Sequence, residues 1–68
     1  MRVRYKDPML AQVLILKNGM SYAEVSQELG KNRCYISKSL KSGCISPRTA
    51  NKLCEVLNVD FDEVFKIE

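Results

Sequence analysis

Apolar residues recur at helical spacing in five stretches of the chain, and each stretch is bounded by residues that begin or end a helix. The helices predicted from this pattern cover residues 9–17, 21–30, 33–41, 47–58 and 60–67. No stretch keeps the two-residue alternation of a strand for more than a few residues. The sequence therefore predicts an all-α fold, a compact bundle of about five short helices, and makes a sheet improbable.

The start of each predicted helix carries a side chain that can accept a hydrogen bond from the amides of the first turn. Two of these caps precede a proline at the first helical position, and two form a capping box with a glutamate three residues later. In chain order the predicted caps are Asp7 with Pro8, Ser21 with Glu24, Asn32, Ser46 with Pro47, and Asp60 with Glu63. Gly19, Gly30 and Gly43 follow the first three helices, where glycine ends a helix most cheaply.

The apolar stripes define the expected core. The inward residues are expected to be Leu10, Val13 and Leu14, then Val25 and Leu29, then Ile36 and Leu40, then Ala50, Leu53, Cys54, Val56 and Leu57. The last stretch carries Phe61, Val64, Phe65 and Ile67, which is more apolar surface than one short helix buries easily. Phe61 and Val64 fit the core, and Phe65 and Ile67 are the candidates for a dimer or partner surface.

The chain has 68 residues, enough for one domain with one small core. We expect a single domain over residues 1–68, with a basic arm at 1–7 and a C-terminal helix or tail at 60–68. No apolar run is long enough to span a bilayer, and the N-terminus lacks the apolar segment of a signal peptide, so we expect a cytoplasmic protein that contacts no membrane.

The chain has three cysteines, ten residues apart, and no histidine. This set lacks the close pairs of ligands that hold zinc, so we expect no metal and no cofactor. Cys54 is interpreted as a small core residue, and the thiols as reduced. With no histidine, no nucleophile beside a recognisable base and no glycine-rich phosphate loop, we expect no catalysis.

Charge is unevenly distributed along the chain. The formal net charge is only +3, yet residues 31–54 hold six basic residues and no acid, while five of the eight acids lie in the last fourteen residues. Such a separation is typical of a surface that binds a polyanion, although a basic stretch on one helix is often only a solvated face.

Two short helices joined by a turn with glycine, here over residues 21–41, are the sequence form of a helix-turn-helix. With the apolar stripe inward, the outer face of the second of these helices carries basic, hydroxyl and aromatic side chains suited to the edges of DNA bases. The candidates for reading bases are Arg33, Cys34, Tyr35, Ser37 and Lys38. Free amides at the starts of both helices can bind phosphates, which makes Ser21, Tyr22, Asn32 and Lys41 candidates for the DNA backbone.

The ordered set of residues 19–30, then Ile36-Ser37-Lys38, then residues 46–64 resembles the phage repressor and Cro family of helix-turn-helix domains, which are XRE-like. The resemblance covers about residues 9–65. It implies a lambda-repressor-like fold in which residues 33–41 form the recognition helix in the major groove. Arg33, Cys34, Ser37 and Lys38 then occupy positions that usually face bases, and Asn32 and Lys41 positions that usually contact the backbone.

Two features depart from the family pattern. Tyr22 stands where many members carry a glutamine that touches a phosphate and braces the recognition helix. The stretch from Lys38 to Gly43 is one residue longer than usual and lacks a common glutamate, so the following loop is expected to track the backbone differently.

Several alternatives stay open at this point. Arg2, Arg4 and Lys6 belong to an arm that contacts DNA or to a frayed terminus. Tyr35 touches DNA or packs over the edge of the core. Cys34 is a small side chain near a base or a redox switch.

The preferred hypothesis is a Cro-like or short repressor-type transcription regulator of phage or mobile-element origin, which binds double-stranded DNA as a homodimer. The alternative is a co-regulator or antirepressor that binds a partner protein, such as a repressor, through its apolar C-terminal surface.

Overall fold

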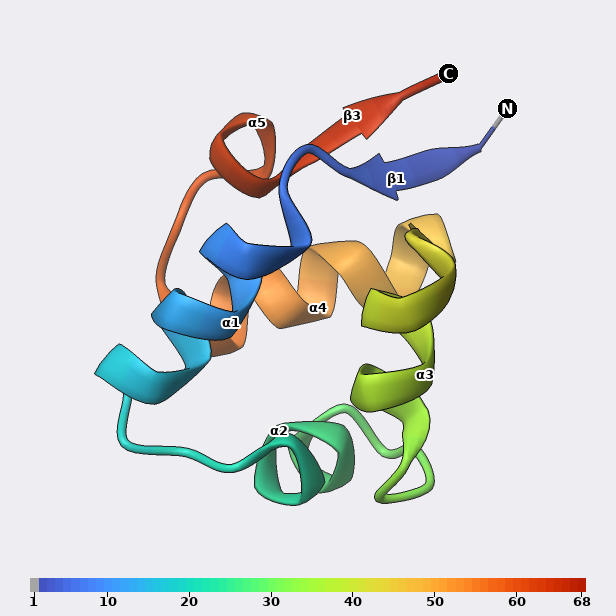
Figure 1. Ribbon diagram of the computed structural model, residues 1–68. Coiled ribbons are helices and arrows are strands. Elements are labelled where there is room, and N and C mark those ends of the chain that lie inside the picture. Colours follow the sequence, from blue (N-terminus) through green and yellow to red (C-terminus); the bar gives the residue numbers. More distant parts are fainter. Residues whose placement is uncertain (1) are drawn as a thin grey trace.

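The computed structural model describes residues 2–68 and confirms a mostly helical fold, to which it adds a small sheet (Figure 1). In chain order the elements are β1 (Val3–Tyr5), α1 (Pro8–Lys17), α2 (Tyr22–Glu28), α3 (Tyr35–Ser42), β2 (Cys44–Ile45), α4 (Pro47–Leu57), α5 (Phe61–Val64) and β3 (Phe65–Ile67). Met1, the first residue of the expected arm, lies outside the described residues. Within residues 2–68 no helix is long and apolar enough to cross a membrane.

Three of the predicted caps form as expected. The carboxylate of Asp7 accepts a hydrogen bond from the backbone N–H of Met9 at 3.0 Å. Ser21 and Glu24 make both bonds of a capping box, at 3.2 and 3.1 Å. Ser46 accepts from the backbone of its own first turn and precedes the proline of α4. These local side-chain bonds place the starts of α1, α2 and α4 where the sequence predicts them.

Two other caps differ from the prediction. The side chain of Asn32 accepts from the N–H of Cys34 at 2.9 Å, so it closes a turn, and α3 begins only at Tyr35. Asp60 makes no side-chain cap, and the N–H of Glu63 bonds to its backbone carbonyl instead. The helix that follows is a single turn, since its last residue is Val64.

The sheet is a correction to the prediction of a purely helical fold. β1 is the central strand and pairs antiparallel with β2 on one side and β3 on the other. Val3 lies opposite both Ile45 and Ile67. Strands of two or three residues are too short to show alternation, and their partners come from distant parts of the chain, so no local pattern predicted them.

The inward face of α1 also differs from the prediction. Ala11 and Ile15 are fully buried and Leu14 is half-buried, whereas Leu10 and Val13 are 37% and 40% exposed. Because α1 is apolar on nearly all sides, its sequence does not select a face. Packing against the rest of the core selects it, and the small Ala11 side chain permits a close approach.

The C-terminal segment is corrected in a similar way. Phe65 is the first residue of β3 and is completely buried, with its ring centroid 4.9 Å from that of Tyr5 and 5.3 Å from that of Phe61. It is therefore a core residue, not a surface one. Ile67, the other candidate for an interface, is 58% exposed.

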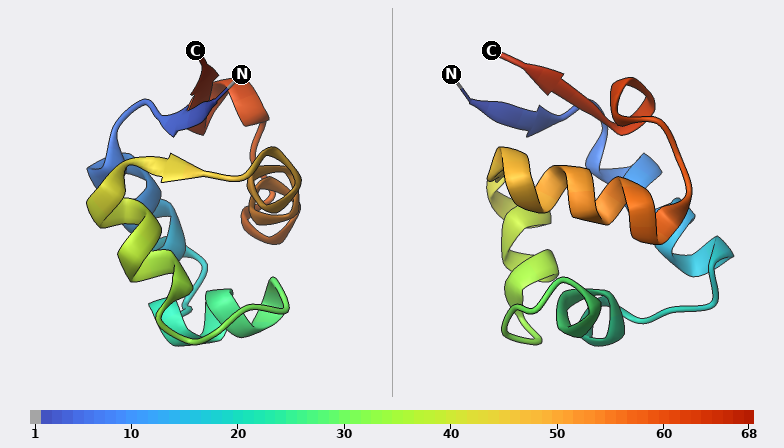
Figure 2. Two further views of the ribbon diagram at one scale, coloured as in Figure 1. Left: turned by 90° about the vertical axis from the view of Figure 1, so that its right-hand side faces the viewer. Right: turned by 180° about the vertical axis from the view of Figure 1, so that it is seen from behind.

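The sheet and α2 lie at opposite ends of the molecule, with α1, α3 and α4 between them (Figures 1 and 2). The largest fully buried side chains come from all of these layers, and they are Phe65, Ile15, Ile36, Leu53, Val25 and Val64. One core thus joins the two ends of the chain to α3.

Candidate nucleic-acid interface

A buried serine links α2 to α3. The hydroxyl of Ser26 donates to the carbonyl of Tyr22 at 2.8 Å and accepts from the backbone N–H of Ile36 at 3.1 Å. Ser26 is fully buried. An amide in the first turn of a helix has no partner within that helix, so this bond satisfies it and fixes the start of α3 against α2. Gly30, at a φ of +72°, makes the turn between them.

A second buried serine links α3 to the sheet. The Oγ of Ser39 donates to the carbonyl of Ile36 at 2.9 Å and lies 2.8 Å from the hydroxyl of Tyr5. Since the serine proton is used in this way, the tyrosine donates to Ser39. Burial raises the pKa of Tyr5 to about 12, so the phenol is neutral and keeps its proton at ordinary pH. Tyr5 therefore ties the middle of α3 to the central strand.

Sequence reasoning missed Ser26 and Ser39. Both stand on the inner stripe of a helix, next to Val25 and three residues after Ile36. A small polar residue on an apolar stripe needs a hydrogen-bond partner if the stripe is buried, and that was the available signal.

The candidate base-reading residues lie together along the exposed side of α3 and the turn before it. Ser37 and Lys38 are exposed on α3 itself, whereas Arg33 and Cys34 are exposed in the turn, because the helix begins two residues later than predicted. Helix α3 lies on the side of the molecule that faces the viewer in the left panel of Figure 2. None of these basic side chains is in an ion pair within residues 2–68, so they carry net positive charge toward solvent.

Tyr35 is half-buried and packs against the core. The ammonium group of Lys31 lies 5.6 Å from the centroid of its ring, within the range of a cation–π contact. The ring also borders a hollow of about 360 Å³ with Lys38, Ser42 and Cys44. Tyr35 therefore packs over the edge of the core, with Lys31 beside its ring.

The hydroxyl of Ser37 donates to the carbonyl of Cys34 at 3.1 Å. With its proton used inside the helix, its oxygen is left as an acceptor. An acceptor at this position matches the amino groups of adenine or cytosine in the major groove.

The candidate backbone contacts lie at the start of α2, in the turn before α3 and in the last turn of α3. Ser21 caps α2 and Asn32 closes the turn before α3, and both are exposed. Tyr22 is half-buried and packs against the core. Lys41 is exposed in the last turn of α3. The extra residue noted before Gly43 is absorbed by α3, which continues to Ser42 and passes through a left-handed Gly43 directly into β2.

The expected arm is a strand, so neither a frayed terminus nor a free arm describes residues 2–6. Arg2 exchanges two backbone hydrogen bonds with Glu68, and Lys6 donates to the carbonyl of Val64. The guanidinium of Arg4 lies 3.5 Å from the carboxylate of Glu68, an exposed pair. A Cβ on Gly43 would lie 3.5 Å from the same guanidinium, so Arg4 stands at the end of α3.

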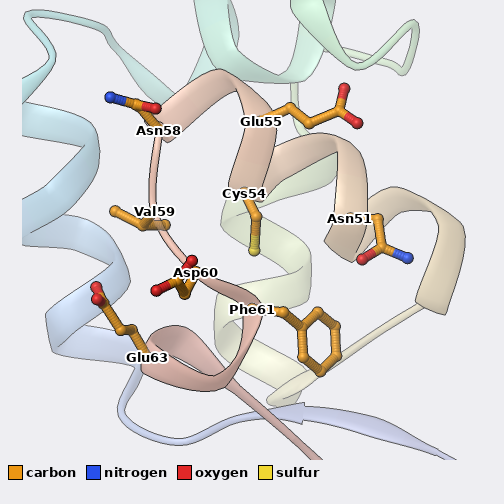
Figure 3. A pocket seen from close by; sticks show the side chains of 8 residues that line it. All are labelled: Asn51, Cys54, Glu55, Asn58, Val59, Asp60, Phe61 and Glu63. Atoms are coloured by element: carbon orange, nitrogen blue, oxygen red, sulfur yellow. The ribbon is translucent and has the colours of Figure 1, made fainter.

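The other side of the molecule is acidic. A hollow of about 680 Å³ between α4 and α5 is bordered by Glu55, Asp60 and Glu63 (Figure 3). Cys54 lies at this hollow, and burial together with the Asp60 carboxylate raises the pKa of its thiol, which opposes formation of a thiolate. This confirms Cys54 as a buried residue of the core. The negative charge of these carboxylates opposes the approach of a polyanion on this side.

A model of the helix-turn-helix family matches residues 10–64, from the first turn of α1 to the end of α5. The chain belongs to the XRE-type helix-turn-helix family. Its members are DNA-binding transcription regulators and the family is not one of enzymes. Comparisons with curated proteins and with solved structures gave no match. In this XRE-type protein, the two buried serines hold the helix that carries the exposed side chains of Ser37 and Lys38.

Proposed function

We propose that this XRE-type protein recognises a specific DNA operator by placing α3 in the major groove. The observation that carries the proposal is a row of three exposed side chains, Ser37 and Lys38 on α3 and Arg33 in the turn before it. Two buried serines fix the orientation of this helix. Base readout needs side chains held in register, because a bidentate bond to a base tolerates little movement. Arg33, Ser37 and Lys38 provide the hydrogen-bond donors and acceptors. Ser26 and Ser39 hold α3 in a fixed orientation.

In this proposal the roles follow the positions of the side chains. Arg33 and Lys38 donate to guanine, Ser37 accepts from an amino group, and Cys34 lies close to a base. Ser21, Tyr22, Asn32 and Lys41 contact phosphates around them. Arg4 contributes positive charge from β1, and Arg2 and Lys6 from the residues that flank it, rather than from a flexible arm.

The proposed assembly is a two-fold dimer that reads two half-sites about one helical turn apart. We propose a Cro-like or short repressor-type regulator of phage or mobile-element origin, acting in the cytoplasm. Within one domain of this size, regulation depends on its own concentration, on competition for sites or on a partner.

The test is selection of duplexes from a random pool, followed by measurement of affinity at several salt concentrations. Sequence-specific binding predicts a selected duplex bound at least about 10³-fold more tightly than random DNA, with a salt dependence equivalent to several phosphates. Arg33→Ala and Lys38→Ala should each weaken specific binding by about 1–3 kcal/mol. Lys17→Ala is the matched control, since it removes one exposed charge from the last turn of α1.

Equal affinity for selected and random duplexes, or equal losses in all three variants, would contradict the proposal. Such a result would favour the second candidate, a protein-binding co-regulator or antirepressor. One observation favours that candidate: α1 leaves Met9, Val13 and Leu16 exposed, at 69%, 40% and 64%. Leu16→Ser would then reduce regulation more than Arg33→Ala does.

A further inference from the structure

We infer that β3 is a self-association edge, at which a second copy of this chain adds its own β3 antiparallel, with Ile67 at the two-fold axis. The inference gives the proposed two-fold dimer a specific interface, and its test below is independent of DNA. It starts from the sheet order β2-β1-β3, in which β3 has a strand on one side only. An edge strand presents unpaired backbone groups that can be extended by another chain.

The backbone of Ile67 faces the open edge. Arg2 and Glu68 exchange hydrogen bonds in both directions, at 3.1 and 2.8 Å, so they form a hydrogen-bonded pair of the antiparallel ladder. Such pairs alternate with pairs that are not hydrogen-bonded, and Val3 with Ile67 is the next pair along. The N–H and C=O of Ile67 therefore point away from β1, toward solvent or an added strand.

Charge and hydrogen bonding together select the register. If Ile67 lies opposite Ile67 of the second copy, both of its backbone groups are used, and each Lys66 lies opposite a Glu68. If Lys66 lies opposite itself instead, two like charges face each other. That second register also needs the N–H of Phe65, which already donates to the carbonyl of Phe61. The edge is therefore complementary to itself in one register.

The side chain of Ile67, on the core-facing side of β3, supports the same register. Ile67 is 58% exposed although it lies on the same face of the sheet as the buried Val3. It borders an apolar hollow of about 280 Å³ with Val3, Pro47, Asn51 and Phe61. Ile67 of the second copy would lie beside Ile67 and help to cover this hollow. The ends of β1 and β3 project together from the molecule (Figure 1), and among residues 2–68 no further strand pairs with β3.

The free edge of β2 and the exposed apolar side of α1 do not show this self-complementarity. The edge of β2 is two residues long and is followed directly by Ser46 and Pro47, and proline cannot donate to a ladder. The exposed side of α1 has no charge pattern that selects an occupant. A short ladder makes a small interface, so we expect a reversible dimer that strengthens when two copies bind adjacent half-sites.

The first experiment is sedimentation equilibrium of the full chain without DNA over a wide concentration range. The wild-type protein should dimerise reversibly, and Ile67→Pro should weaken dimerisation at least tenfold. Proline removes only the N–H that faces the open edge, so the bonds of β3 to β1 are kept. Leu16→Asp is the matched control, a change at an equally exposed apolar residue that should leave dimerisation unchanged.

Charge reversal keeps the inference testable if Ile67→Pro folds poorly. Lys66→Glu and Glu68→Lys each put like charges opposite one another in a homodimer, so neither variant should self-associate. An equal mixture should form a heterodimer, because one acidic and one basic side chain would then face each other in both of the pairs that flank the axis. A wild-type protein that stays monomeric, a mixture that stays monomeric, or a dimer lost in Leu16→Asp but kept in Ile67→Pro would overturn the inference.

Affinity for a duplex with one half-site separates this inference from the proposed function. Specific half-site binding by Ile67→Pro at wild-type affinity would show that DNA recognition does not depend on the β3 edge. A dimer that forms without specific DNA binding would keep the inference and overturn the operator proposal.

Discussion

The helix-turn-helix is built mainly from contacts between residues close in the sequence, and the sheet from contacts between residues far apart in it. In α2 and α3 the defining hydrogen bonds join residues three to ten positions apart, such as Ser21 with Glu24 and Ser26 with Ile36. In the sheet, β1 pairs with β3 across sixty to sixty-four positions. Local contacts cost little chain entropy to form, whereas pairing the two ends orders the whole chain between them. The helix-turn-helix is thus specified mainly by local contacts, and the sheet closes the core around it.

The two regions meet at Tyr5. Its ring packs on Phe65 within the sheet, and its hydroxyl bonds to Ser39 on α3. A change in the sheet can therefore act on α3 through stability, whereas a change at the start of α3 can act on its orientation as well as on stability. The variants below separate these two effects.

The largest effect is expected at the sheet. Phe65→Ala removes a fully buried ring that contacts Tyr5 and Phe61, and should lower the free energy of unfolding by about 3–5 kcal/mol. For a domain of this size such a loss approaches the total stability. Urea denaturation followed by circular dichroism measures it.

Ile67→Ala, two residues further along β3, is the matched control. Its side chain is 58% exposed, so the loss should stay well below that of Phe65→Ala. Similar losses at the two positions would show that β3 does not pack as described.

An intermediate effect is expected inside the helix-turn-helix. Ser26→Ala leaves the N–H of Ile36 buried without its acceptor, which should cost about 1–3 kcal/mol of stability. Because this N–H lies at the start of α3, specific DNA binding should fall further than the loss of folded protein explains. Both quantities are measured on the same sample, by denaturation and by titration with the selected duplex.

Ser42→Ala serves as the control, since Ser42 is exposed in the last turn of α3 and its hydroxyl bonds only to backbone groups of Ser39 and Cys44, two or three residues away. It should change stability and specific binding little. A Ser26→Ala protein with full specific affinity per folded molecule would contradict the role of Ser26 in orienting α3.

The same contrast explains what the sequence could and could not predict. The starts of α1, α2 and α4, and the inward positions of Val25, Leu29, Ile36 and Leu53, follow from signals a few residues apart, and the structure agrees with them. The family assignment confirms the helix-turn-helix that those signals predicted.

The predictions from sequence were wrong where contacts between residues distant in the chain determine the local structure. From the local sequence, Phe65 fits a helix and Arg4 fits a free arm. Both residues belong instead to strands that pair with each other from opposite ends of the chain. In α1 the apolar residues surround the helix, so only tertiary packing identifies Ala11 and Ile15 as the inner pair. The candidate base-reading residues are exposed as expected, and their contacts with DNA stay a prediction.

The smallest effect at neutral pH, and the sharpest test of the link between the two regions, is expected for Tyr5→Phe. The variant keeps the ring and loses the hydroxyl that donates to Ser39, while Ser39 still bonds to the carbonyl of Ile36. Stability should fall by about 1 kcal/mol at pH 7, because one buried hydrogen bond is lost without a new cavity.

The pH dependence of stability tests whether Tyr5 is the residue responsible. Burial raises the pKa of Tyr5 from 10.0 to about 12, so the folded protein holds this proton more tightly than the unfolded chain. The stability that this difference supplies is complete below pH 10 and is lost as the pH rises toward 12, by about 1–2 kcal/mol. The urea midpoint measured at pH 9 and at pH 11 should therefore fall more in the wild-type protein than in Tyr5→Phe. Tyr22→Phe, a change at a tyrosine outside the sheet, should keep the pH dependence of the wild-type urea midpoint. An identical fall of the midpoint in all three proteins would mean that Tyr5 is not the buried phenol that joins the sheet to α3.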